Sequence, residues 1–212
     1  IQISSGPLDT SGFGAVPELP LSLIDEIEAS DPSLGIVRVT PLVLYVRGGL
    51  SPSTSFVFQG LPPSVDVAGI YPGYEITAGR GLDARDAGTN VAVVGVQAAE
   101  RSNLEIGDVL RLSSSAIFEI VGLADASGGL LGNGILVPIT ALQAAIGTPE
   151  RVSFLIVDID DPSRAQAVAD ELSERFPDLG VQTAGDVLSV LERGIRITDV
   201  VRLGISAIAL IV

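Results

Sequence analysis

The chain has 212 residues, with 12 basic and 26 acidic side chains, so its formal net charge is −14. All the basic residues are arginines, and the sequence contains no histidine, cysteine, lysine, methionine or tryptophan. These absences exclude zinc, haem and iron–sulfur ligation of the usual kinds, thiol and Ser-His-Asp catalysis, and the lysine of a phosphate-binding loop or a Schiff base. An acidic chain also repels phosphate, which argues against nucleic acid as a partner.

The N-terminal part predicts a tether followed by one helix and one strand. Residues 1–19 are rich in Gly, Ser and Pro, which is typical of a tether rather than of packed structure. Apolar residues then recur at helical spacing from Leu21 to Ile27, and residues 34–46 form an apolar, β-branched run typical of a strand. Pro41 lies inside that run and predicts a bulge, a sheet edge or a break.

Residues 50–149 differ from their flanks, because short apolar runs alternate there with turns that contain Gly and Pro. This pattern predicts a compact β-rich unit. Two short helices are expected in it, at Val96–Asn103 and Ile139–Ile146, and Ser113–Ser115 has the composition of a hairpin turn. The runs that we expect to form its strands are Ser55–Gln59, Val65–Ile70, Val91–Gly95, Val109–Leu112, Ile117–Leu123 and Ile135–Val137.

The next segment predicts a strand, a helix and a second strand. Arg151–Ile159 is a long and mostly apolar run, which indicates a strand. Asp161 and Pro162 follow as the expected cap and first residue of a helix. Ala165–Phe176 then has apolar residues along one helical face, and Val181–Thr183 is typical of a short strand.

The predicted fold class is α+β, with a split domain. We expect residues 1–19 to be a tether after a first transmembrane helix. Residues 20–49 and 150–184 are expected to form one split α/β subdomain. The β-rich residues 50–149 are expected to be inserted into it, and residues 185–212 to form a stalk helix that leads into the start of a second transmembrane helix.

The last predicted helix begins at the cap residue Asp186 and leads toward a membrane. Residues 203–212 carry no charge, but a helix that crosses a bilayer needs about 20 apolar residues. We interpret them as a truncated transmembrane segment, and the alternative is a buried C-terminal core helix. Arg193, Arg196 and Arg202 precede this run and would contact lipid phosphates at the interface, unless they form an ordinary polar helix face.

Two stretches offer ligand chemistry, and a structural role explains each of them more simply. Asp158, Asp160 and Asp161 have the oxygen atoms that Ca²⁺ prefers, but a strand end followed by a helix cap accounts for all three. Residues Ser127–Gly134 resemble a phosphate-binding loop but lack its lysine and its strand-before-helix order. We expect a hairpin tip there, which could contact a partner.

A pair of carboxylates for acid–base catalysis could be drawn from Asp83, Asp86, Glu100 and Glu105, but their spacing selects no two of them. All four are expected at polar turns or helix faces, where solvated carboxylates are ordinary. The sequence therefore offers no catalytic, metal-binding or cofactor-binding residue, and we expect the protein not to be an enzyme.

The middle of the chain carries a series of short motifs in a fixed order: Gly79-Arg80, the predicted strand Val91–Gly95 followed by a short helix, Gly107-Asp108, Val121-Gly122 and Val137-Pro138. In these motifs it resembles the extracytoplasmic, MacB-like periplasmic core domain of FtsX-like and MacB-like ABC-transporter permeases. The resemblance implies a domain between two transmembrane helices, with a β-rich insertion in a split α/β subdomain.

The resemblance also implies a function outside the membrane. A permease of this type works as a homodimer or heterodimer with a cytoplasmic ABC ATPase, and its extracytoplasmic domain couples ATP hydrolysis to conformational change or substrate handling. Membrane lipid would contact the C-terminal helix. The main alternative is a membrane-anchored surface or assembly module without a transport role, and a hydrolase that uses two carboxylates is a third possibility.

Overall fold

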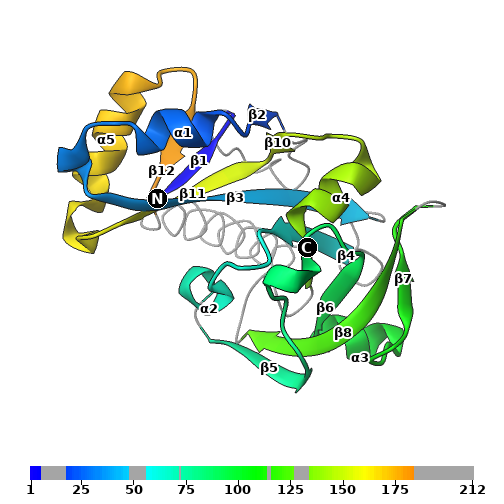
Figure 1. Ribbon diagram of the computed structural model, residues 1–212. Helices are drawn as coiled ribbons and strands as arrows, with labels where there is room; N and C mark the ends of the chain where they lie inside the picture. The colour runs from blue at the N-terminus through cyan, green and yellow to red at the C-terminus, as the bar shows by residue number, and fades with distance from the viewer. Residues whose placement is uncertain (6–17, 48–55, 72, 114–115, 127–133, 184–212) are drawn as a thin grey trace, which may run out of the picture.

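The computed structural model describes residues 1–5, 18–47, 56–71, 73–113, 116–126 and 134–183 (Figure 1). One mixed sheet of ten strands runs through this part of the chain. Its strands are β1 (Gln2–Ser4), β3 (Ile36–Arg47), β4 (Phe56–Leu61), β5 (Tyr74–Gly79), β6 (Val91–Gly95), β7 (Val109–Arg111), β8 (Ile117–Ala126), β9 (Gly134–Pro138), β11 (Phe154–Ile159) and β12 (Gly180–Gln182). They lie in the order β12-β1-β11-β3-β4-β9-β6-β8-β5, and β7 pairs with β8. Two short strands, β2 (Leu19–Pro20) and β10 (Arg151–Val152), form a separate small sheet.

The two faces of the large sheet carry two separate apolar clusters. The helices are α1 (Leu23–Glu28), α2 (Val67–Ile70), α3 (Val96–Ser102), α4 (Ile139–Ile146) and α5 (Ala165–Arg175). Side chains of α1, α3, α4 and α5 enter the first cluster, whereas α2 packs against the second. Successive residues of a strand point to opposite faces, so Val39 and Val43 of β3 lie in the first cluster while Leu42 and Leu44 lie in the second.

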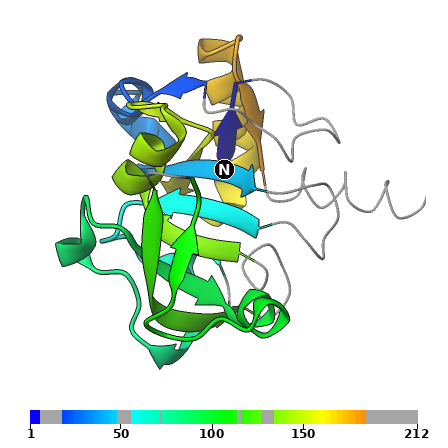
Figure 2. The same cartoon turned by 90° about the vertical axis from the view of Figure 1, so that its right-hand side faces the viewer.

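Strand β3 belongs to both halves of the sheet. Its first part pairs with β11 up to Leu42, and its second part pairs with β4 from Val43 onward. Pro41 lies just before this change of partner, and the strand continues through it. The amide nitrogens of even-numbered residues face β11, as Leu44 does when it donates to Ser153 Oγ at 3.0 Å. The nitrogen of Pro41 therefore faces away from β11, toward the side on which β3 pairs with β4 only from Val43 onward. Proline has no N–H to donate, and at this position no hydrogen bond of the sheet is lost. Figure 2 shows β3, β4 and β9 side by side beyond this point.

The prediction of a tether over residues 1–19 is wrong for the first few residues, and also for Leu19, which is buried and belongs to β2. Gln2–Ser4 forms β1, which lies between β11 and β12 and pairs antiparallel with both. Ile3 is fully buried in the first cluster. The composition gave no sign of this strand, because its partners lie more than a hundred residues away in the sequence.

The predicted strand Val65–Ile70 is also wrong, because its last four residues form the short helix α2. Asp66 caps this helix by accepting a hydrogen bond from the Ala68 N–H at 3.2 Å. The predicted strand Arg151–Ile159 is divided at Ser153, whose N–H donates to Leu42 O at 2.9 Å. β5 was missed entirely.

The other predicted elements that fall on described residues are confirmed with small shifts of their ends. The first predicted helix corresponds to α1, and the two helices of the middle segment correspond to α3 and α4. The antiparallel pairing of β7 and β8 confirms the predicted hairpin. Asp161 caps the 3-10 turn Pro162–Arg164 that leads into α5, as expected. The division of the chain into 20–49 plus 150–184 and 50–149 stays a prediction, since the large sheet passes without interruption from one part to the other.

None of the described helices is long and apolar enough to cross a membrane. The predicted stalk helix from Asp186, the apolar run 203–212 and the three arginines before it lie outside the described residues.

Candidate functional site

Three of the dipeptides that carry the family resemblance meet at one crossing of the chain. Gly79 and Gly122 are paired residues of β5 and β8. A Cβ atom on Gly122 would lie 2.0 Å from Arg80 O, and one on Gly79 would lie 2.4 Å from Val121 O. Only glycine permits this approach, which brings Arg80 N within 3.0 Å of Val121 O.

The third dipeptide, Gly107-Asp108, holds the turn that precedes β7 against β8. Gly107 N–H donates to Ile120 O at 2.9 Å, and Ile120 N–H donates to Asp108 O at 2.9 Å. The Asp108 carboxylate accepts from Glu105 N–H at 2.8 Å, which closes the turn. The backbone of Gly107 has φ +92°, a conformation that other residues rarely adopt.

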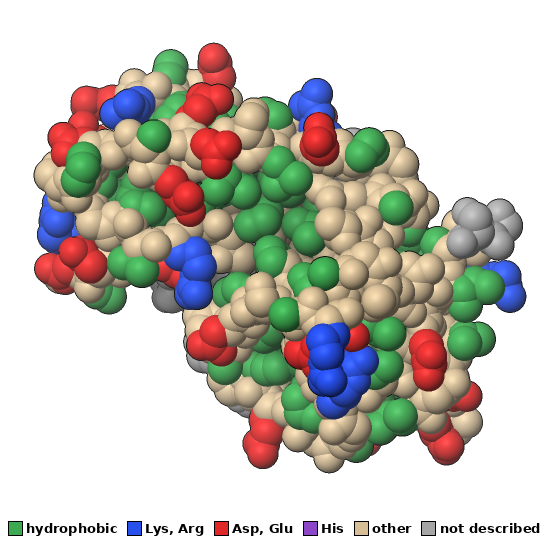
Figure 3. Space-filling model, in the orientation of Figure 1, with side chains coloured by type: hydrophobic (Ala, Val, Ile, Leu, Met, Phe, Trp, Pro, Cys, Tyr) green, Lys and Arg blue, Asp and Glu red, His purple; other side chains and the backbone are tan. Residues whose placement is uncertain are grey.

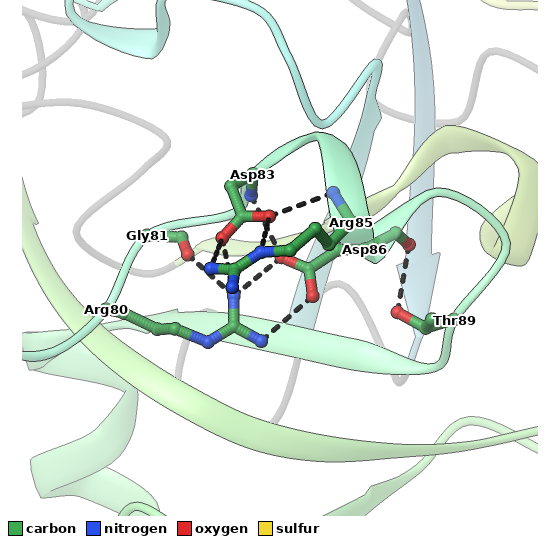
Figure 4. Close-up of polar contacts among 6 residues, drawn as sticks. All are labelled: Arg80, Gly81, Asp83, Arg85, Asp86 and Thr89. Carbon is green, nitrogen blue, oxygen red and sulfur yellow. Dashed lines mark hydrogen bonds and ion pairs between the residues drawn. The ribbon is translucent and has the colours of Figure 1, made fainter.

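Beyond the crossing, Arg80 is fixed by a nearly buried carboxylate (Figure 4). The guanidinium donates to both oxygens of Asp86, at 2.6 and 2.8 Å, and Asp86 is only 4% exposed. Asp86 also accepts from Asp83 N–H at 2.9 Å, and the Asp83 carboxylate accepts from Arg85 N–H at 2.9 Å. This reciprocal pair is a capping box around the 3-10 turn Ala84–Asp86, and we call the four charged residues the arginine clasp.

The electrostatics of the arginine clasp argue against acid–base catalysis. The hydrogen bonds from Arg85 lower the pKa of Asp83 to about 2, and those from Arg80 lower the pKa of Asp86 below its usual range. Both carboxylates are therefore ionised near neutral pH and hold no proton to donate. Their oxygens are already occupied by arginine and backbone N–H groups, so the clasp orders the loop after β5.

The other two candidate carboxylates lie at a different place. Glu100 and Glu105 line a surface hollow of about 370 Å³ between α3 and the outer strands, together with Asn103 and Asp125. The structure thus brings Asp83 and Asp86 together but separates them from Glu100 and Glu105. In the described part of the chain, no three acidic residues are grouped so that they could hold a metal ion.

The acidic run at the end of β11 is explained by local contacts. Asp158 pairs with Arg38 at 2.8 Å, and Asp161 accepts from the Ser163 N–H at 2.9 Å as a cap. The backbone N–H of Asp160 donates to Gly35 O at 2.9 Å. A hollow of about 760 Å³ lies beside the Arg38–Asp158 pair, but the arginine charge there is already neutralised by its partner.

Of the loop Ser127–Gly134, only Gly134 lies among the described residues, as the buried first residue of β9. On the face shown in Figure 3, acidic side chains are spread over the surface rather than gathered in one patch. The arginine clasp was missed from the sequence, although the spacing of Asp83 and Asp86 is that of a capping box and could have indicated it.

The family model of the MacB-like periplasmic core domain matches residues 1–175. The periplasmic region of MacB from Actinobacillus actinomycetemcomitans is similar in structure, with a TM-score of 0.63 and 15% identity over 90% of this chain and 91% of that one. The extracellular domain of the noncanonic ABC-type transporter YknZ from Gram-positive bacteria has a TM-score of 0.60 and 16% identity, over 86% of this chain and 99% of that one.

No curated protein matches the sequence. The two structural likenesses show a shared fold at low identity, and the family model covers well over half of the chain. The chain belongs to the family of MacB-like periplasmic core domains.

Proposed function

We propose that this domain is the extracytoplasmic, non-catalytic part of an ABC-transporter permease, and that it passes conformational changes driven by a partner ATPase to the space outside the membrane. The family assignment supports the permease, and the structural relatives are themselves regions of transporters that lie outside the cytoplasm. A dimer of permeases and contact of the C-terminal helix with lipid are parts of the same proposal.

The proposed coupling between the membrane segments and this domain rests on one observation: the first and the last strand of the sheet are neighbours. Gln2 of β1 is the registered neighbour of Gln182 of β12, although 180 residues separate them in the sequence. Segments attached before β1 and after β12 would therefore act on two hydrogen-bonded strands at the same edge of the sheet. A displacement of these segments would reach β11 and then β3, which is the strand that continues into the rest of the sheet.

The arginine clasp and the acidic side chains have structural roles in this proposal. The clasp holds the β5–β8 crossing, and the spread carboxylates keep the surface hydrated. No step of the function requires a reaction at either place.

The proposal is tested on the full-length permease in membranes with its ATPase. Glu171 is exposed on α5, and Glu171→Cys introduces a spin-label site into a domain that has no native cysteine. We expect the distance between labels on two permease copies to change when ATP is hydrolysed, and to stay constant with an ATPase variant that binds but does not hydrolyse ATP. A membrane-anchored assembly module would show no ATPase in the purified complex and no nucleotide-dependent change of distance, and either result would refute the coupling.

A further inference from the structure

The segment between β4 and β5 covers the second face of the sheet without joining it. We call residues 62–71 the strap. Its backbone hydrogen bonds close within itself: Val65 N–H donates to Pro62 O at 3.0 Å, and Tyr71 N–H donates to Val67 O at 2.8 Å. Asp66 caps α2 inside the strap. Among the hydrogen bonds between described residues, one joins the strap backbone to a strand: Tyr74 N–H, at the first residue of β5, donates to Tyr71 O at 3.0 Å, where the strap leads into that strand.

The strap is attached by partly buried apolar side chains and one polar contact. Val65, Val67 and Ile70 pack against the second cluster and remain partly exposed. The hydroxyl of Tyr71 donates to Gln59 Oε1, which lies on β4 beneath the strap. This is the one side-chain hydrogen bond that links the strap to the sheet within the described part of the chain.

Gln59 is an unusual residue for this position. It is fully buried, and its registered neighbours on the same face are Leu44 of β3 and Leu136 of β9. Its Nε2 has no hydrogen-bond partner among the described residues. A buried amide without an acceptor is destabilising, and water would satisfy it as soon as the strap moved away.

We infer that the strap opens as a unit, lifting Tyr71 from Gln59 and exposing Leu61 and Leu136 while the sheet stays folded. Opening breaks no hydrogen bond of the sheet ladder. It gives up one side-chain hydrogen bond and partial apolar contacts, and it hydrates the unpaired amide of Gln59. The strap begins at the stiff pair Pro62-Pro63, and Gly73 just beyond it has φ +82°, so both ends favour movement of the segment as one piece. Segments that open locally belong to the least stable parts of a fold.

Thiol labelling tests this inference in the full chain, because the chain has no cysteine of its own. Leu136 and Val137 are neighbours on β9, both almost fully buried, but Leu136 faces the strap and Val137 faces the opposite cluster. Leu136→Cys should react with a maleimide faster than Val137→Cys, since global unfolding exposes both equally. Equal rates in the two variants would overturn the inference.

A second substitution tests the attachment itself. Tyr71→Phe removes the hydroxyl and should speed labelling of Leu136→Cys about fivefold, the factor that one hydrogen bond of typical net strength represents. The labelling of Val137→Cys should not change, and Tyr45→Phe, at a partly exposed tyrosine of β3, should affect neither rate. If Leu136→Cys does not fold, hydrogen exchange of the unmodified chain gives the same answer. Amides of residues 65–71 should then exchange at native conditions well before those of β4 and β9, and simultaneous exchange would overturn the inference.

Discussion

Replacing Gly122 by alanine tests whether the β5–β8 crossing is as tight as the structure indicates. The new Cβ would lie 2.0 Å from Arg80 O and 2.9 Å from Arg80 C, while ordinary contact begins at 3.4 Å, so the strands must separate by about 1.4 Å. Both obstacles are backbone atoms, which no side-chain rotation can move. Overpacking of this kind costs about 1–3 kcal/mol, and loss of the Arg80 N–H bond to Val121 O adds about 1 kcal/mol. We expect Gly122→Ala to lower the free energy of unfolding by about 2–4 kcal/mol, a large part of the stability of a typical domain.

The assay is urea denaturation of the domain with Gly88→Ala as the matched control. Gly88 follows the arginine clasp with φ +75°, but a Cβ there would have no atom within 4 Å. Its replacement should therefore cost only about 1 kcal/mol, from the backbone conformation alone. If the two variants lose the same stability, the crossing is not the constraint on Gly122 and the reasoning from its contacts is wrong.

Three further predictions concern charge, pH and packing. Asp86→Ala should lower the free energy of unfolding by about 2 kcal/mol at neutral pH, because it removes charged hydrogen bonds to Arg80. Because the pKa of Asp86 is lowered from 3.8, its contribution is present above pH 3.8 and disappears as the pH falls through the folded-state value, so wild type and variant should converge in acid denaturation curves. Burial raises the pKa of Tyr71 and Tyr74 to about 12, so the free energy of unfolding should fall as the pH rises from 10 to 12. Tyr71 accounts for at most about 3 kcal/mol of this fall, and Tyr71→Phe should therefore flatten the plot of unfolding free energy against pH. Phe58→Ala should cost about 3–5 kcal/mol in thermal or urea unfolding, because the fully buried ring packs against Phe118 at a centroid distance of 6.2 Å, whereas Val37→Ala at a 67% exposed position should change stability by less than about 0.5 kcal/mol.

The sequence predicted those elements whose signals are local. Helix α4 was predicted with its observed bounds, because its apolar spacing is bounded by Pro138 and by Gly147, which has φ +75°. The cap at Asp161 was found for the same reason, since the side chain and its partner Ser163 are two residues apart. Strand β3 could be predicted because it is a long run of 12 residues, rich in β-branched and apolar side chains, and this local composition is enough to indicate a strand.

The elements that the sequence did not reveal depend on distant partners. β1 has three residues, and only its pairing with β11 and β12 makes them a strand. α2 was read as a strand because a short apolar run has the same composition in either state, and the cap at Asp66 decides between them. The polar pair of Tyr71 and Gln59 could not be predicted, because nothing local indicates which face of β4 the strap covers. The family resemblance rests on dipeptides that are far apart in the sequence. Their contact at the glycine crossing could not be predicted, because it forms only in the folded chain.

The place of β1 in the sheet has a consequence for biosynthesis. Gln2 pairs with Ile156, so β1, once it has been made, waits until 154 more residues have been added before its first partner exists. Its second partner, β12, is made later still. Contacts of such sequence separation slow folding, because the entropy of closing the loop must be lost before any contact is gained. We therefore expect the middle strands β6 to β9 to pair early, and the edge formed by β11, β1 and β12 to be completed last, on a sheet that has already formed.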